Sequence, residues 1–150
     1  MSAPRADKAV RLAQGVQKLL LDLGYDSLTE VKLRIRRRVD VMGIDEKGRI
    51  IIVEVKSGPA DYRVDEKWRE YLDFCDEFYF AVDADFPQGL IPPENGLIVA
   101  DSFGGVILRP SSDFNLNAAR RRNVTLRFAR IAARRLFDAE TPIKEKFDVF

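Results

Sequence analysis

Apolar and polar positions along the chain alternate with two periods, and each change of period marks an expected element. Residues 5–23 place apolar side chains three or four positions apart, which predicts a helix that Gly24 ends. Residues 28–35 and 37–45 alternate as strands do. The second of these strands is expected to place Val39, Val41 and Gly43 on one side and Asp40, Met42 and Ile44 on the other.

The next segment, residues 49–56, is apolar on both faces from Ile50 to Val53, which is typical of a buried central strand. Further elements are expected as a helix at about 63–75, a strand at 77–82, a loop at 86–96 with one short helical turn, strands at 97–101 and 105–109, and a long helix at about 115–137. A tail at 138–150 follows. The core order αβββαβ predicts one α/β domain over residues 1–150, with a mixed central sheet flanked by helices and a core at about 8–137.

A hairpin between the second and third strands brings two carboxylates together. We expect a three-residue loop at 46–48, with Gly48 in the left-handed conformation that such loops favour. Counting outward from Asp45 opposite Arg49, the facing pairs include Ile44 with Ile50, Met42 with Ile52, Val41 with Val53, and Asp40 with Glu54. The intermediate pairs are apolar, which supports this register, because a shift by one residue would reverse the faces.

Lys56 lies one pleat beyond Glu54 on the same side of the strand. Charges at the end of a buried strand are costly unless they are paired or used. Two neighbouring carboxylates can hold Mg²⁺, which polarises a phosphate and lowers the pKa of a bound water, and a lysine can orient that water or offset charge. The spacing therefore indicates a phosphodiester-cleaving site of Asp40, Glu54 and Lys56. The alternative is a salt bridge of Lys56 with Glu54 or Asp40.

Composition narrows the chemistry of this cluster. The chain of 150 residues contains no histidine, which excludes Ser-His-Asp and Cys-His nucleophilic sites and His-ligated zinc. Its single cysteine, Cys75, forms no internal disulfide and fits a reducing compartment. A metal would have oxygen ligands, which favours Mg²⁺ or Mn²⁺. Without a signal-peptide core or an apolar run of ~20 residues, we expect a soluble, cytoplasmic protein with no membrane contact.

The residues of this cluster resemble the PD-(D/E)XK nuclease signature, with Val39-Asp40 followed by Glu54-Val55-Lys56. Longer blocks are similar to the MmcB-like DNA-repair family, and they are residues 37–42, 53–57, 61–62, 67–72, 75–81 and 96–101. This resemblance covers roughly residues 8–137. It implies a restriction-endonuclease-like fold, Mg²⁺ dependence and a role in DNA repair, and the fold also includes binding-only members.

One position departs from that pattern. Many nucleases of this fold carry a metal-binding glutamate on the first helix, whereas this chain offers only Gln14, Gln17 and Asp22 there. If a tight turn at 34–36 joins the first two strands, Glu30 lies opposite Asp40 and would be a third metal ligand. The alternative is a solvent-exposed acid on an edge strand.

Other polar residues lie on the expected helix after Lys56. Lys67 and Tyr71 share a face at i and i+4. Because this helix often presents a polar residue to the site in the nuclease fold, Lys67 is a fourth catalytic candidate, and the alternative is a surface lysine. Asp61 and Asp65 also share a face, as groups behind the site or as acids favoured by the helix dipole. Trp68 is expected in the core.

Two groups of arginines are candidates for contact with nucleic acid. Residues 114–137 contain no acid, and Asn123, Arg127, Arg130 and Arg134 form one stripe opposite Val124, Phe128, Ile131 and Leu136. Arg36, Arg37 and Arg38 directly precede the acidic site. Such arginines follow a phosphate backbone without reading sequence. The alternative is a solvated helix face that pairs with acids such as Asp73, Asp76 and Glu77.

Together these features predict a Mg²⁺- or Mn²⁺-dependent endonuclease that acts in DNA repair on damaged, branched or single-stranded DNA. One alternative is a non-catalytic DNA- or protein-binding module of the same fold, recruited by another repair protein. Another is an RNA-processing nuclease, although the sequence offers no RNA-binding motif. Other repair proteins and a second copy of the chain, as a homodimer, are further candidate partners.

Overall fold

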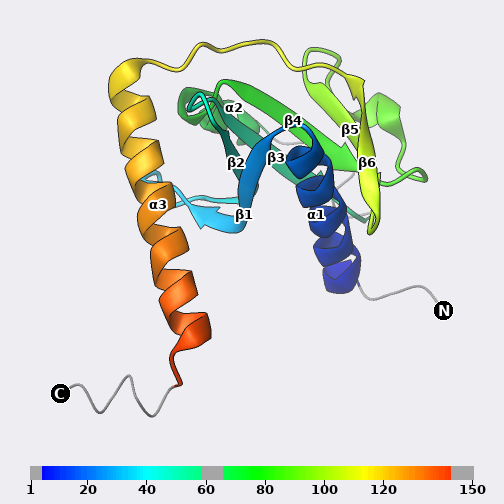
Figure 1. Ribbon diagram of the computed structural model, residues 1–150. Coiled ribbons are helices and arrows are strands. Elements are labelled where there is room, and N and C mark those ends of the chain that lie inside the picture. The colour runs from blue at the N-terminus through cyan, green and yellow to red at the C-terminus, as the bar shows by residue number, and fades with distance from the viewer. Residues whose placement is uncertain (1–4, 59–65, 143–150) are drawn as a thin grey trace.

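A six-stranded mixed sheet organises the computed structural model, which describes residues 5–58 and 66–142 (Figure 1). The strands are β1 (Tyr25–Lys32), β2 (Arg38–Asp45), β3 (Ile50–Lys56), β4 (Glu77–Val82), β5 (Gly96–Asp101) and β6 (Gly104–Arg109), and they lie in this order across the sheet. The β3–β4 and β4–β5 pairs are parallel, whereas the other pairs are antiparallel. The central strand predicted at 49–56 is therefore confirmed.

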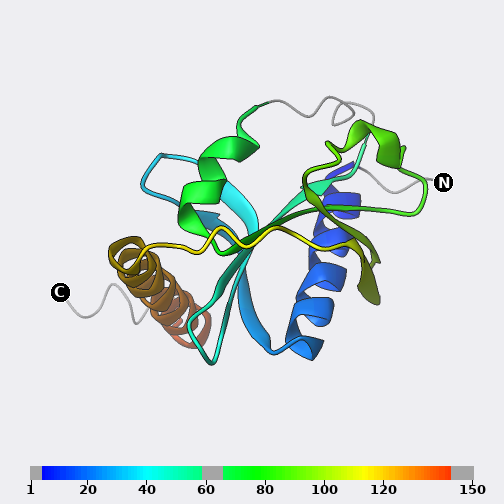
Figure 2. The same cartoon turned by 90° about the horizontal axis from the view of Figure 1, so that it is seen from above.

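Helices cover both faces of this sheet, as the view from above shows (Figure 2). They are α1 (Arg5–Asp22), α2 (Trp68–Tyr71), the 3₁₀ turns η2 (Leu72–Phe74) and η3 (Gln88–Leu90), and α3 (Ala118–Glu140). On one face, Leu12, Val16 and Leu20 of α1 pack against β2 to β5. On the other face, α2, η2 and α3 enclose a second core. The α/β class, the mixed central sheet flanked by helices and the core order αβββαβ are confirmed.

Trp68 lies in the second core, as expected. Its side chain is buried, and its ring lies 6.1 Å from that of Phe78 and 6.3 Å from that of Phe80, measured between centroids. The helix expected at 63–75 is shorter within the described residues, because its last turn is 3₁₀ and β4 begins at Glu77. Residues 63–65, Asp61 and Asp65 lie outside the described residues.

The boundaries of β1 and α3 differ from the prediction. β1 starts at Tyr25, whose buried side chain joins the core under α1. A turn follows it, in which the N–H of Leu33 donates to the carbonyl of Arg37 and the N–H of Arg36 donates to the carbonyl of Leu33. α3 starts after Asn117, whose side chain accepts a hydrogen bond from Arg120 N at 2.8 Å and caps the helix. It continues to Glu140, so the start of the predicted tail is helical.

A buried aspartate connects α3 to the sheet through hydrogen bonds. Asp76 is 0% exposed and accepts hydrogen bonds from Arg121 Nη1 at 2.6 Å and Nη2 at 2.7 Å. It also accepts bonds from the backbone N–H groups of Ile50 and Leu116. This one carboxylate therefore joins β3, the segment before α3, and α3 itself.

Candidate functional site

The register of the β2–β3 hairpin follows the prediction. Gly48 has a φ of +84°, and its N–H donates to the carbonyl of Asp45 at 3.0 Å. The facing pairs are Ile44 with Ile50, Gly43 with Ile51, Met42 with Ile52, and Val41 with Val53. The next position along brings Asp40 to Glu54.

At this position, side-chain bonds replace the backbone ladder. The N–H of Asp40 donates to Glu54 Oε1 at 3.0 Å, and the N–H of Val55 donates to Asp40 Oδ2 at 2.7 Å. Each carboxylate thus accepts a bond from the backbone of the opposite strand. The two acidic side chains are held together where β2 and β3 stop pairing.

The same position interrupts the alternation expected for β2. Val41 packs in the core under α1, as expected, but Val39 packs with Met42 in the core under α2 and α3. The expected placement of Val39 and Val41 on one side is therefore wrong. The side chains of β2 change their facing around Asp40, the position where its backbone pairing with β3 ends.

The electrostatics of the pair reflect its crowding. Burial, and next the charge of Asp40, raise the pKa of Glu54 to about 8, whereas Lys56 acts to lower it. Lys56 Nζ lies 5.8 Å from the ring centroid of Phe80. A metal-free Glu54 therefore holds a proton at neutral pH, and a cation between the carboxylates would favour its ionised form.

A cavity of about 870 Å³ opens beside the two carboxylates. It is bounded by α1, β1, β2 and β3, and its polar lining residues are Gln14, Gln17, Thr29, Glu30, Asp40, Glu54, Lys56 and Ser57. Thr29 and Ser57 are lining residues that the sequence argument did not single out. Both are next in sequence to a predicted site residue, Glu30 or Lys56, and this position could have identified them.

The predicted pairing of Glu30 agrees with the structure, since the pairs Thr29–Val41 and Val31–Val39 flank it and Asp40. Glu30 has a φ of +51°, a left-handed conformation that costs a non-glycine residue about 1–2 kcal/mol. Arg135 of α3 supports this backbone by donating to the carbonyl of Thr29 at 2.7 Å and to that of Glu30 at 2.9 Å. Such strain often lies at functional sites.

The first helix presents amide side chains to the cavity. Gln14 and Gln17 both line it, and Gln17 Nε2 donates to Ser27 Oγ at 3.1 Å. Asp22 is exposed at the end of α1 and is not among the described lining residues. Lys67, directly before α2, is also exposed and is also not among the described lining residues of this cavity.

The arginines before Asp40 have different surroundings. Arg36 lies in the turn with a φ of +60° and is exposed, as is Arg38. Arg37 instead forms an ion pair with Glu70.

The arginines of the α3 stripe also differ from one another in their surroundings. Arg127 donates to the carbonyl of Lys32 at 3.3 Å, whereas Arg130 and Arg134 are exposed. Leu136, expected on the apolar side, is 58% exposed because the last turns of α3 extend past β1 (Figure 1). Of the acids named as alternative partners, Asp76 binds Arg121, which is not part of the stripe.

The donor atoms at this site suit a magnesium ion. Mg²⁺ is usually bound through one or two carboxylates and keeps several waters or substrate phosphates as its other ligands. Asp40 and Glu54 supply two carboxylates, each oriented by a backbone N–H. Over residues 5–58 and 66–142, no three Asp, Glu or Cys side chains gather into a metal-binding group. This donor set fits Mg²⁺ or Mn²⁺ better than a metal that needs a complete protein cage.

The sheet, its covering helices and the paired carboxylates define an α/β domain with an acidic site at the end of its central strand. The chain matches the family described as DNA repair protein MmcB-like over residues 1–143. It therefore belongs to the MmcB-like DNA-repair family.

A solved protein of unknown function from Silicibacter pomeroyi is 38% identical and superposes with a TM-score of 0.82, over 95% of this chain and 99% of that one. A repair endonuclease from Pyrococcus abyssi shows 16% identity and a TM-score of 0.36, over 55% of this chain and 39% of that one, a likeness too slight to support an argument. No curated protein matches the sequence significantly. None of the described helices is long and apolar enough to span a membrane.

Proposed function

We propose that this protein is a Mg²⁺-dependent nuclease that hydrolyses phosphodiester bonds of DNA during repair. The observation that carries the proposal is the cross-bonded pair of Asp40 and Glu54, which opens into a cavity that Lys56 also lines. A strand-end salt bridge alone would not need two carboxylates crowded enough to raise the pKa of one of them.

In this proposal Asp40 and Glu54 would hold the metal, with Glu30, which lines the same cavity, as the candidate third ligand. Bound Mg²⁺ supplies positive charge that polarises the phosphate and lowers the pKa of a nearby water. Lys56 orients the attacking water and offsets the negative charge that develops on the phosphate. Gln14 and Gln17 hydrogen-bond to the substrate or its water from the side of α1. Lys67 is left out because it lies away from the described lining of the cavity.

The exposed arginines around the site supply the contacts to the DNA backbone. Arg36 and Arg38 are exposed and close to Asp40 in sequence, and Arg130 and Arg134 are exposed on α3. These contacts position a strand without selecting its sequence. With Cys75 as a buried free thiol, we place this activity in the reducing cytoplasm, on damaged, branched or single-stranded DNA.

The test is cleavage of supercoiled plasmid and of labelled single-stranded, flap and junction DNA with Mg²⁺ or Mn²⁺. We expect Asp40→Asn and Lys56→Met each to reduce the rate by at least about a hundredfold. Asp26→Asn and Lys47→Met are matched controls, because both residues are exposed and neither is among the described lining residues. Wild-type rates in Asp40→Asn or Lys56→Met would refute the assignment.

A binding-only role is the second candidate, favoured by the lack of a third clustered carboxylate among the described residues. Thermal unfolding with added Mn²⁺ separates the two roles, because a metal that binds the folded state raises its melting temperature. A nuclease should show a Mn²⁺-dependent rise that Asp40→Asn abolishes. Unchanged melting with Mn²⁺, together with intact DNA binding and no cleavage, would support the binding-only role.

A further inference from the structure

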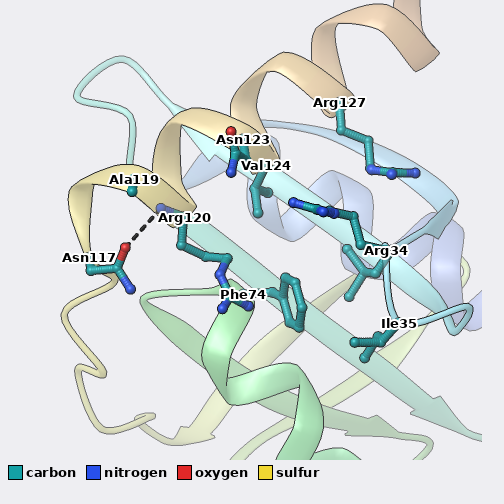
Figure 3. Close-up of a pocket in the computed structure, with 10 residues that line it drawn as sticks. Arg34, Ile35, Phe74, Asn117, Ala119, Arg120, Asn123, Val124 and Arg127 are labelled. Atoms are coloured by element: carbon teal, nitrogen blue, oxygen red, sulfur yellow. Dashed lines mark hydrogen bonds between the residues drawn. The ribbon is translucent and has the colours of Figure 1, made fainter.

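A second cavity lies between α3 and the turn that joins β1 to β2 (Figure 3). Its volume is about 510 Å³, and its walls come from residues 33–35, from Phe74 at the end of η2, and from the first half of α3. None of these residues lines the acidic cavity around Asp40. The two cavities are therefore separate sites on the molecule.

Three arginines give this second cavity its charge. Arg34 reaches from the turn toward α3, and Arg120 and Arg127 project from α3 itself (Figure 3). Of the described residues that line the cavity, none is acidic. The guanidinium carbon of Arg120 lies 4.6 Å from the ring centroid of Phe74, and Arg127 donates to the carbonyl of Lys32. Two of the three cations are thus held in place before any ligand binds.

The remaining wall is apolar. Leu33, Ile35, Phe74 and Val124 line it, and Ile35 is 38% exposed. Small-molecule sites typically have volumes of about 300–1,000 Å³, with apolar walls and a few polar groups that fix orientation. A free phosphate would leave most of such a cavity empty. The combination suits a ligand with a flat apolar part and an anionic part, which describes a nucleotide.

We infer that this second cavity binds one unpaired nucleotide of a DNA strand. Its base and sugar lie against Ile35 and the apolar wall, and its phosphate lies between Arg34 and Arg120. Asn123, which also lines the cavity, offers an amide to the base edge. Because a paired base is stacked inside the duplex, the site selects single-stranded or locally opened DNA over a regular duplex.

The position of the cavity relates this inference to the acidic site. Leu33 follows Glu30 by three residues, a span of about 10 Å along an extended chain. The linings of the two cavities are therefore close along the backbone, since Glu30 belongs to the first and Leu33 to the second. In this respect the inference rests on the proposed function, because it names the class of substrate for that site, but its test measures binding alone.

The test is fluorescence anisotropy in EDTA with a labelled oligonucleotide of twelve thymidines and with a duplex of the same length. We expect tighter binding of the single strand, and a loss of roughly tenfold in Arg34→Gln and in Arg120→Gln. Arg122→Gln is the matched control, since Arg122 is exposed on α3 and is not among the described lining residues. It should change affinity by less than about threefold. Arg34 is exposed, so Arg34→Gln should keep the fold.

Competition identifies what the cavity recognises. Unlabelled thymidine monophosphate should displace the oligonucleotide at a lower concentration than inorganic phosphate does. Equal displacement by the two, equal losses in Arg34→Gln and Arg122→Gln, or equal affinity for single strand and duplex would each overturn the inference. A wild-type protein that binds the single strand in EDTA but cleaves no DNA with Mg²⁺ would contradict the nuclease proposal and leave this inference standing.

Discussion

Asp76 and Glu54 are two carboxylates in the interior of one small protein, and their pKa values shift in opposite directions. Burial acts to raise the pKa of Asp76, but hydrogen bonds from Arg121 and from two backbone N–H groups outweigh it and hold the pKa below its ordinary value. Glu54 has another carboxylate, Asp40, as its neighbour, and its pKa rises. The hydrogen bonds to Asp76 stabilise the fold. Glu54 and Asp40 instead form a pair of carboxylates that a bound cation would stabilise, and such perturbed pKa values are common at functional sites.

The ion pair of Asp76 makes a prediction about stability. Arg121→Met leaves the buried carboxylate without its cation, and we expect a loss of about 3–5 kcal/mol at pH 7, measured by urea unfolding. A carboxyl with a lowered folded pKa stabilises above its unfolded pKa of about 3.9, and this contribution is lost as the pH falls through the folded value.

The difference between wild type and Arg121→Met should therefore narrow as the pH is lowered below about 4. Arg122→Met, at the exposed next position, is the control and should change stability by less than about 0.5 kcal/mol. A constant difference across this pH range would show that Arg121 stabilises the protein through contacts other than its ion pair with Asp76.

Sequence predicted the core of the candidate site because its pairing follows from counting. A three-residue loop with Gly48 determines the facing pairs, and apolar residues confirm each step up to Asp40 and Glu54. The left-handed backbone of Glu30 and its support by Arg135 could not be predicted in this way. They depend on an interaction between residues 105 positions apart, which no local pattern encodes.

Among the elements, α1 is held to the sheet most closely at a glycine. A Cβ atom added to Gly15 would lie 1.6 Å from the carbonyl oxygen of Asp101, which means that the backbone of α1 touches the β5–β6 turn directly. The neighbouring residue Gln14 lines the acidic cavity. The glycine therefore sets the distance at which α1 presents its amides to the candidate site.

We expect Gly15→Ala to destabilise the protein by about 1–3 kcal/mol, because α1 or the turn must move to admit the methyl group. Chemical denaturation measures the loss. Gly89→Ala is the matched control, since an added Cβ there has no neighbouring atom within 4 Å. Equal effects of the two substitutions would show that the close approach of α1 contributes nothing to stability.

The helix α3 shows where periodicity succeeds and where it fails at the scale of elements. Its type followed from the spacing of Val124, Phe128 and Ile131, which face the core. Its start was predicted too early. Leu116, before the helix, donates to Asp76, and the side chain of Asn117 caps the first turn, and a pattern of apolar residues gives no information about either hydrogen bond. Leu136 was assigned to the buried side although no sheet remains beneath it.

For the whole molecule, a net charge of +1 hides a strongly uneven distribution. Arginines gather on α3 and on the β1–β2 turn, and three of them line the second cavity. Binding to DNA that depends on such a surface weakens with salt, because each neutralised phosphate releases counterions. The salt dependence therefore reports how many of these arginines bind the DNA backbone.

We expect the double variant Arg130→Gln and Arg134→Gln to reduce the slope of log affinity against log salt by about 1.4 for single-stranded DNA, or roughly 0.7 for each phosphate that is no longer neutralised. Anisotropy titrations at several salt concentrations measure it. The control is Arg5→Gln together with Arg11→Gln, which removes the same charge from α1. An unchanged slope in the α3 variant would exclude the C-terminal half of this helix from the interface.

The ion pair of Asp76 and Arg121 also affects how the protein folds while it is being synthesised. The ribosome produces Asp76 before its partner, which follows 45 residues later. Strands β1 to β3 are then complete in sequence, but the carboxylate that their core must bury has no cation to pair with. A nascent chain that stops before residue 121 should therefore remain open and accessible to proteases. The first three strands of the sheet become stably folded only after α3 has been synthesised.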